Sequence, residues 1–275
     1  MNGWIICNNG IMKRIFRWVP VVMSVIMAIS CVKEITDSEI RKVDLTFSAY
    51  AVNDTKTILA EGNEVHWLPG DEIAVSGSEE PFVASVTEAS SFTEFIGSAY
   101  EMSSYYAVYP YSLFRSWTEY GAQVEIPDVQ KAVNGSFADD LNLSVAKTGR
   151  EEMSLRFKNV SGYVKFTLPD SYDHIVHSVT IKTNADEPIA GVMDVDFSDE
   201  NPVLSPTDNV SSSVELASST SFEAGTYYIS VIPGTYSDGL SICFKNVRNE
   251  EDVIYISGEL TMSMGQIRNI GMISD

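Results

Sequence analysis

The chain has 275 residues and is strongly acidic, with 18 Lys and Arg against 38 Asp and Glu and a formal net charge of −20. A surface of this charge repels phosphate backbones and anionic lipid head groups, so nucleic-acid binding is excluded as the expected function. Hydrophobic residues make up 44% of the chain and aromatic residues 11%, which excludes wholesale disorder. Because the length exceeds that of one typical compact domain, we expect two domains.

The N-terminal region has the pattern of a bacterial lipoprotein signal peptide. From Met12, a basic leader precedes an apolar run at 19–29 that is too short to span a bilayer permanently. Small and aliphatic residues then precede Cys31, as in the lipobox that lipoprotein signal peptidase cuts, although Ala28 stands where Leu is usual. We therefore expect cleavage between Ser30 and Cys31, and lipidation of Cys31.

Residues 1–30 are thus assigned to the signal peptide, with the true start of translation at Met12. The polar segment 31–42 is typical of a flexible tether between the lipid and the first folded residue. Cys243 is then the one cysteine of the mature chain besides the lipidated residue, so we expect no internal disulfide.

From Val43 onward the pattern predicts β-strands nearly everywhere. In segment 43–52, Val43, Leu45 and Phe47 alternate with polar residues, which is typical of a half-buried strand. Similar short runs, rich in β-branched and aromatic residues and separated by turn residues, follow at 72–75, 82–87, 105–110, 123–127, 153–157, 162–168, 175–183, 189–197, 226–232, 240–247, 253–261 and 266–273. This spacing predicts an all-β chain of antiparallel β-sandwiches.

Few segments depart from the strand pattern. Segment 136–147 is the best helical candidate, although a loop followed by a short strand fits equally well. The polar segments 199–213 and 218–225 are expected to be loops. A further loop at 147–152 separates two strand sets of similar size, so we divide the chain there into an N-terminal sandwich at 43–150 and a C-terminal sandwich at 151–275.

No pattern typical of a catalytic or metal site stands out. His174 and His177 would point to opposite faces of a strand, which is poor geometry for a shared metal. The acidic run 194–201 begins like a calcium-binding loop, but Asp199 stands where that loop needs Gly. We expect a solvated acidic turn there, with a weak calcium site as the alternative. We also expect no cofactor, no enzymatic activity, and a stability that is insensitive to chelators and reductants.

A group of aromatic residues suggests a binding surface. Its members are Tyr105, Tyr106, Tyr109, Tyr111, Trp117 and Tyr120. Exposed members would form a platform for a sugar ring, whereas strand alternation predicts that about half of the group belongs to the core.

Several short sequences follow one another in a recognisable order: HWLPGDEIAV, YYAVYPY, VEIPDVQKA, LSVAKT, LRFKNVSGYVKFTL, IAGVMDVDF, YYISVIPGTYSDGLSICFKN and GQIRNIG. This order, together with the lipobox, resembles the fimbrillin-like family of Bacteroides-type bacteria over most of the mature chain. The resemblance implies a lipoprotein precursor with two β-sandwich domains of transthyretin-like, Greek-key type. It also implies a stalk, anchor or tip subunit of a type V pilus, or a related adhesin, located in the outer membrane at the cell surface or in a fimbrium.

The same resemblance implies that shaft subunits polymerise after a protease removes the first strand, which leaves a groove for a strand of a neighbour. Here Arg41 and Lys42 precede the strand, so cleavage there would keep it, and Lys56 is the one basic residue of the following loop. The chain also stops just after its presumed last strand. We therefore expect an anchor, tip or solitary adhesin; the alternative is a glycan-binding surface lipoprotein. The expected partners are outer-membrane lipid through Cys31, and other fimbrial subunits or a host or bacterial surface ligand.

Overall fold

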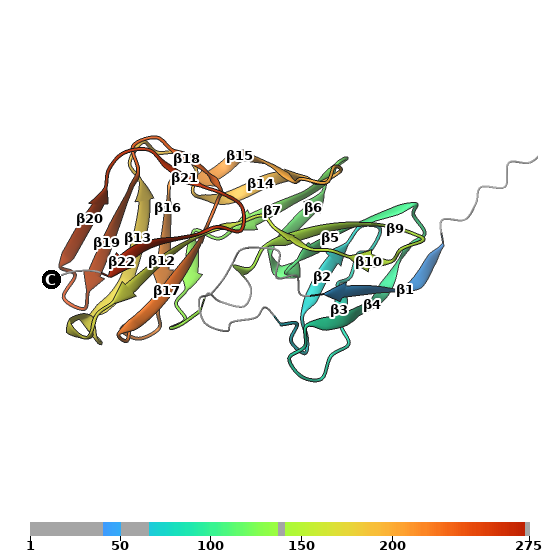
Figure 1. Ribbon diagram of the computed structural model, residues 1–275, viewed down its shortest axis with the longest axis horizontal. Helices are drawn as coiled ribbons and strands as arrows, with labels where there is room; N and C mark the ends of the chain where they lie inside the picture. The colour runs from blue at the N-terminus through green and yellow to red at the C-terminus, as the bar shows by residue number, and fades with distance from the viewer. Residues whose placement is uncertain (1–40, 51–65, 137–140, 273–275) are drawn as a thin grey trace, which may run out of the picture. The chain divides into compact units, whose positions relative to one another are not determined.

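The computed structural model describes residues 41–50, 66–136 and 141–272, which form an almost all-β protein (Figure 1). The expected all-β fold is therefore confirmed. The expected lipidation, cleavage and processing residues Ser30, Cys31 and Lys56 lie outside the described residues. Two short 3-10 helices, η1 (Tyr111–Leu113) and η3 (Asp170–Tyr172), interrupt the strands. Within the described ranges, no helix has the length and apolar character needed to cross a membrane.

The largest sheet has the strand order β10-β1-β4-β3-β2-β5-β9-β11. Its strands are β1 (Lys42–Tyr50), β2 (Glu72–Val75), β3 (Phe82–Ala84), β4 (Phe92–Tyr100), β5 (Ser104–Tyr109), β9 (Ser144–Gly149), β10 (Ser154–Leu155) and β11 (Lys158–Asn159). β1 pairs antiparallel with β4 along its whole length. On its other side, it pairs with β10 at Ser48 and Ala49, and no other described strand pairs with it there.

β1 has the predicted alternation of buried and exposed side chains. Phe47 and Ala49 are fully buried, and the Phe47 ring lies 5.5 Å from the Phe82 ring and 5.1 Å from the Tyr105 ring, measured between centroids. Gly97 on β4 makes this packing possible, because a Cβ atom there would lie 2.7 Å from the ring of Phe82. The core of this sheet is thus built from close contacts among aromatic rings.

Four further sheets are formed in the described residues, with strand orders β17-β12-β22, β20-β19-β13-β16-β8, β15-β14-β7-β6 and β18-β21. Their strands are β6 (Phe114–Trp117), β7 (Gly121–Ile126), β8 (Val129–Lys131), β12 (Gly162–Leu168), β13 (Val176–Thr183), β14 (Ala190–Asp196), β15 (Val203–Ser211), β16 (Ser213–Ala217), β17 (Gly225–Val231), β18 (Gly234–Tyr236), β19 (Leu240–Asn246), β20 (Glu251–Ile256), β21 (Leu260–Met262) and β22 (Ile267–Met272).

Strands that precede residue 150 share sheets with strands that follow it. β7 pairs antiparallel with β14, and β8 pairs parallel with β16. One cluster of buried side chains accordingly joins Val124 to Phe166 and Ile181, while a second cluster lies within 47–157. The division of the chain at residue 150 and the transthyretin-like topology stay predictions.

Some of the expected loops are strands. Segment 199–213, expected to be a loop, contains β15, which pairs with β14, and the first residue of β16. β15 lies at an edge of its sheet and is mostly exposed, so its polar side chains and Pro206 are tolerated there. The expected loop at 147–152 begins later than predicted, because β9 continues to Gly149. In segment 136–147, residues 144–147 belong to β9, as the loop-and-strand alternative predicted. Residues 218–224 are irregular, as predicted.

Candidate functional site

The expected processing residues Arg41 and Lys42 lie at the start of β1. Arg41 is exposed, and its carbonyl accepts a hydrogen bond from the backbone N–H of Glu101 at 3.4 Å. Lys42 is the first residue of the strand, with its Nζ atom 2.9 Å from Oε2 of Glu79 and 5.4 Å from the centroid of the Tyr100 ring. The side chain of Lys42 is thus engaged on the surface of the sheet, and its backbone already belongs to β1.

The structure separates the expected aromatic group into core and surface members. Tyr105 and Tyr109 are buried, with exposed fractions of 1% and 8%. Tyr120 is 53% exposed. Tyr106, Tyr111 and Trp117 are partly buried and pack against the core. Of the six residues, two are therefore buried, three are partly buried and one is exposed, which is close to the expected division between core and surface.

Tyr111 and Trp117 lie beside a third ring, Phe114, which is not among the residues of the expected group. The centroids of Tyr111 and Phe114 are 6.4 Å apart with their planes at 29°, and those of Phe114 and Trp117 are 4.6 Å apart with their planes at 43°. We call these three residues the aromatic row. The row follows η1 and β6, and among the described strands β6 pairs with β7 alone.

Polar side chains of β6 and β7 pair on the other face of this sheet. Phe114 and Trp117 lie in register with the buried Val124 and Ala122, whereas Ser116 lies in register with Gln123. Nε of Arg115 donates a hydrogen bond to Oε2 of Glu125 at 2.6 Å, and Oγ of Ser116 donates to Oε1 of Gln123 at 3.3 Å. Nη1 of Arg115 also donates to the carbonyl oxygens of Ser112 and Phe114, at 2.9 and 3.2 Å. The guanidinium group is thereby fixed by three acceptors, and the polar groups are held in place while staying in contact with solvent.

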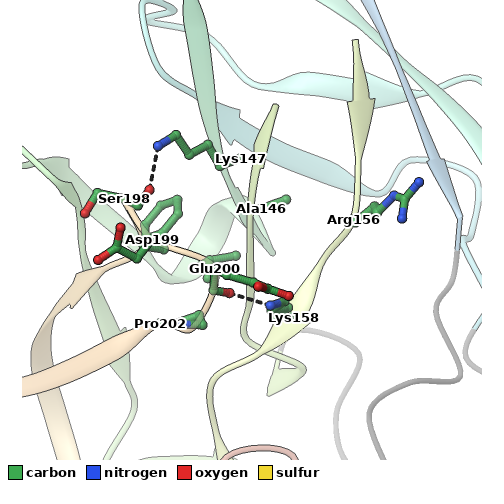
Figure 2. A pocket seen from close by; sticks show the side chains of 10 residues that line it. Ala146, Lys147, Arg156, Lys158, Ser198, Asp199, Glu200 and Pro202 are labelled. Atoms are coloured by element: carbon green, nitrogen blue, oxygen red, sulfur yellow. Dashed lines mark hydrogen bonds between the residues drawn. The ribbon is translucent and has the colours of Figure 1, made fainter. Parts of the chain in front are cut away.

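A second candidate site is a hollow of about 310 Å³ beside β9 and β11, shown in Figure 2. Nζ of Lys147 donates to the carbonyl oxygen of Ser198 at 2.6 Å, and Nζ of Lys158 donates to the carbonyl oxygen of Glu200. Figure 2 shows both lysines reaching the turn that follows β14, whereas Arg156 points away from it. A neighbouring hollow of about 810 Å³ shares Lys158 and Glu200. The two ammonium groups in this region are therefore engaged in holding the turn.

Hydrogen bonds also engage oxygen atoms of the acidic run 194–201, where a weak calcium site was the alternative expectation. Oδ1 of Asp196 accepts hydrogen bonds from Oγ of Ser198 at 2.7 Å and from its N–H at 3.0 Å, and these bonds hold the pKa of Asp196 below its ordinary value. The carbonyl oxygens of Ser198 and Glu200 already accept bonds from lysine ammonium groups. Across residues 41–50, 66–136 and 141–272, no group of three or more His, Cys, Asp or Glu side chains is placed to hold a metal ion.

The two neighbouring histidines do not share a strand. His177 lies in β13, whereas His174 precedes the strand at φ 56°, with its Nε2 atom 3.8 Å from Oδ2 of Asp173. The expectation that a strand would carry both residues is therefore wrong for His174, because the chain turns before β13 begins.

Comparison with known proteins finds likeness in structure. A protein described as a putative cell adhesion protein from Bacteroides uniformis matches with a TM-score of 0.51 and 13% identity, over 84% of this chain and 93% of that one. A protein of the same description from Bacteroides ovatus matches with a TM-score of 0.47 and 14% identity, over 83% and 92%. The tip fimbrial protein Mfa3 from Porphyromonas gingivalis, with C-terminal truncation, matches with a TM-score of 0.37 and 8% identity, over 86% and 96%.

No protein-family model matches the chain, and no curated protein matches it. At 13% identity, the likeness to the Bacteroides uniformis protein is one of fold. The chain thus has the fold of a putative cell adhesion protein from Bacteroides, which is consistent with the fimbrillin-like family that its sequence resembles.

Proposed function

We propose that this chain is a lipid-anchored surface adhesin or fimbrial subunit of a Gram-negative bacterium, with a structural or adhesive role and no catalytic one. The observation that carries the proposal is the fold, which is shared with the Bacteroides uniformis protein over 84% of this chain. The leader at 12–30, followed directly by Cys31, supports export and a lipid anchor in the outer membrane.

Within that role, we favour an anchor, tip or solitary adhesin over a repeating shaft subunit. Cleavage after Arg41 would separate the protein from its lipid and leave β1 in the sheet. Phe47 and Ala49 of β1 are fully buried, so the strand is an integral part of the core and not a loosely held segment. A subunit that keeps its first strand has no empty groove to accept a strand from a neighbour.

A non-catalytic role is supported by the side chains around the two hollows. Their lysines are engaged with backbone carbonyl oxygens, and the described residues offer no cluster of metal-ligating groups. A surface enzyme would instead need paired groups of perturbed acidity that converge in a cleft.

The proposal is tested in bacterial strains that express the natural protein, a Cys31→Ser variant or a Cys243→Ser variant. Cys243 is a free cysteine on β19, so its variant is a matched control for loss of a thiol. We expect palmitate labelling of the natural protein and of Cys243→Ser, together with digestion by protease added to intact cells. Cys31→Ser should be unlabelled and should be released from the membrane or left unprocessed.

Attachment of the same strains to host-cell and bacterial surfaces tests the adhesive role. We expect attachment to be lost together with the lipid label in Cys31→Ser and to be retained in Cys243→Ser. Equal palmitate labelling of Cys31→Ser would defeat the lipid anchor. Attachment that is equal in a strain without the gene would defeat the adhesive role.

A further inference from the structure

One exposed face of the largest sheet carries aromatic, aliphatic and polar side chains next to one another. Tyr50 at the end of β1 lies directly opposite Phe92 at the start of β4, and their ring centroids are 4.9 Å apart. The two side chains are 59% and 37% exposed. Their strand neighbours Ala49 and Thr93 are buried, so both rings lie on the face of the sheet that is in contact with solvent.

Two aliphatic side chains lie farther along the same face. Ile96 follows Phe92 by four residues on β4 and is 51% exposed, and it pairs with Val83 of β3, which is 40% exposed. Because every second side chain of a strand points to the same face, Ile96 and Phe92 share one face. We call Tyr50, Phe92, Ile96 and Val83 the apolar patch. Apolar side chains that are exposed singly are common, whereas a group of them on one face is typical of a binding surface.

A row of polar side chains crosses the patch between the rings and the aliphatic pair. Glu94 lies on β4 between Phe92 and Ile96, and its carbonyl oxygen accepts a hydrogen bond from the N–H of Ser85 at 2.9 Å. The side chains of Glu94 and Ser85 are exposed and alternate with buried neighbours, so they lie on the same face as the rings. The rings and the polar groups therefore share one surface.

This combination fits a sugar. Sugar rings present C–H groups on one face, which pack on apolar side chains, and hydroxyl groups around the rim, which need donors and acceptors. A carboxylate accepts hydrogen bonds from hydroxyl groups, and a serine hydroxyl both donates and accepts them. Neighbouring side chains on one face of a strand are about 7 Å apart, so a sugar that stacks on Phe92 brings its rim to Glu94.

The size of the patch favours a short glycan over a protein partner. From Phe92 to Ile96 the patch extends about 13 Å along β4, and from β1 to β3 it crosses about 10 Å. A stable protein interface buries about 800 Å² on each partner, which is several times the area that these dimensions enclose. Two or three linked sugar rings cover an area of this size.

The charges favour a neutral glycan. Glu94 lies within the patch, and Glu72 of β2 is in register with Val83 at its rim. Lys42, the cation on the same face of β1, is already paired with Glu79 at 2.9 Å. Since the chain as a whole carries −20, a sialylated, uronic or sulfated sugar would meet repulsion on this face, whereas hydroxyl groups would not.

We propose that the apolar patch, with Glu94 and Ser85 beside it, is a binding site for a neutral glycan of two or three sugar rings. This proposal rests on the adhesive function proposed above and gives it a class of ligand. Tyr50 and Phe92 supply the stacking surface, and Glu94 and Ser85 supply hydrogen bonds to the hydroxyl groups. Because Tyr50 belongs to β1, the site is complete only in a molecule that keeps its first strand.

Isothermal titration calorimetry of the purified mature protein measures the affinity of this site. The probes are neutral di- and trisaccharides of glucose, galactose, mannose and N-acetylglucosamine, each beside its sialylated or sulfated form. We expect at least one neutral sugar to bind, with an affinity at least tenfold higher than that of its acidic form. Glu94→Gln should weaken binding of the neutral sugar severalfold and bring the affinities of the two forms closer together.

Variants then assign the binding to the patch. Phe92→Ala and Tyr50→Ala should each lower the affinity at least tenfold, whereas Phe92→Tyr, which keeps a ring at this position, should bind as the natural protein does. Tyr255→Ala is the matched control, because Tyr255 is 73% exposed and lies on β20 in a different sheet. This control should also bind as the natural protein does. Urea unfolding establishes that each variant is folded.

A lack of binding by every neutral sugar would overturn the site, and so would unchanged affinity in Phe92→Ala and Tyr50→Ala or an equal loss in Tyr255→Ala. Equal or tighter binding of the acidic forms would overturn the ligand class. Binding of a basic peptide of lysine and leucine in place of any sugar, with loss of that binding in Phe92→Ala, would assign the face to a protein partner. Cys31-dependent attachment of cells, measured separately, keeps these failures distinct from a failure of the proposed function.

Discussion

At the scale of single residues, Tyr163 at the start of β12 lies in a buried polar network. Nδ2 of Asn159 donates to the Tyr163 hydroxyl at 2.7 Å and to Oδ1 of Asn142 at 2.5 Å, while the Tyr163 hydroxyl donates to Oδ1 of Asn142 at 3.2 Å. Oγ of Ser161 lies 3.2 Å from the same hydroxyl. Burial raises the pKa of Tyr163 to about 12, because the phenolate would be poorly solvated there.

This raised pKa predicts a loss of stability at alkaline pH. The ordinary value is near 10, so in the unfolded chain Tyr163 gives up its proton about two pH units earlier than in the folded protein. The contribution of the protonated Tyr163 to the unfolding free energy is fully present below pH 10. It is lost as the pH rises from 10 to 12, at about 1.4 kcal/mol per pH unit. Tyr163→Phe should cost about 1–2 kcal/mol at pH 7 and remove this part of the alkaline slope.

Urea unfolding between pH 7 and 11.5 measures both effects. Tyr255→Phe, at a residue of β20 that is 73% exposed, is the control and should follow the natural protein at each pH. If the curve of Tyr163→Phe runs parallel to that of the natural protein up to pH 11.5, Tyr163 is accessible to solvent and the network is not closed.

At the scale of the elements, two phenylalanines on paired strands differ in burial. Replacing each of them shows how much of the unfolding free energy depends on burial and how much on lying in a strand. Phe47 on β1 is fully buried, whereas Phe92 on β4 is 37% exposed. Phe47→Ala should therefore lower the unfolding free energy by about 3–5 kcal/mol, the usual cost of a large cavity. Phe92→Ala should lower it by less than about 1 kcal/mol. The midpoints of urea unfolding measure the difference. Equal losses of unfolding free energy in the two variants would mean that Phe47 is not part of a closed core.

The same two strands show which elements could be predicted from the sequence. β1 was predicted because its apolar residues, among them Phe47 and Ala49, face the core and its polar residues face solvent. β4 was missed because the pattern is mixed: Thr93 and Gly97 lie on the core-facing side, whereas Phe92 and Ile96 point to solvent. A strand is recognised in a sequence when apolar residues on one face alternate with polar residues on the other, and β4 has little of this contrast.

β15 and the candidate sites were missed for related reasons. β15 is an exposed edge strand with Pro206 inside it, so its composition is that of a loop. The contacts of Lys147 and Lys158 with the turn after β14 join residues 51 and 42 positions apart, a separation that no local pattern reports. Tyr111 and Trp117 were predicted from their residue type. Phe114 between them was left out, although Phe and Trp are both enriched in strands.

At the scale of the whole molecule, β1 decides whether the fold is closed or open to a neighbouring subunit. Removal of β1 would uncover the full length of β4 and the pocket that Phe47 fills, which together would form a groove for a strand from another molecule. Limited digestion with trypsin distinguishes a fold that keeps β1 from one that releases it, since trypsin cuts after Lys and Arg where the backbone is exposed and weakly held. The backbone from Lys42 onward is paired with β4, whereas Arg41 is exposed just before the strand and its carbonyl accepts one long hydrogen bond, 3.4 Å, from the N–H of Glu101.

We therefore expect limited trypsin treatment of the mature protein to leave a stable product that begins at Lys42. β1 stays in place in that product, so it should elute as a monomer in size-exclusion chromatography, with its N-terminus read by mass spectrometry. Arg41→Gln should remove this cut and leave the elution unchanged. Cleavage after Lys56 accompanied by a ladder of stable oligomers would show the opposite: that β1 leaves the sheet, that a strand of a neighbour takes its place, and that the protein is a shaft subunit.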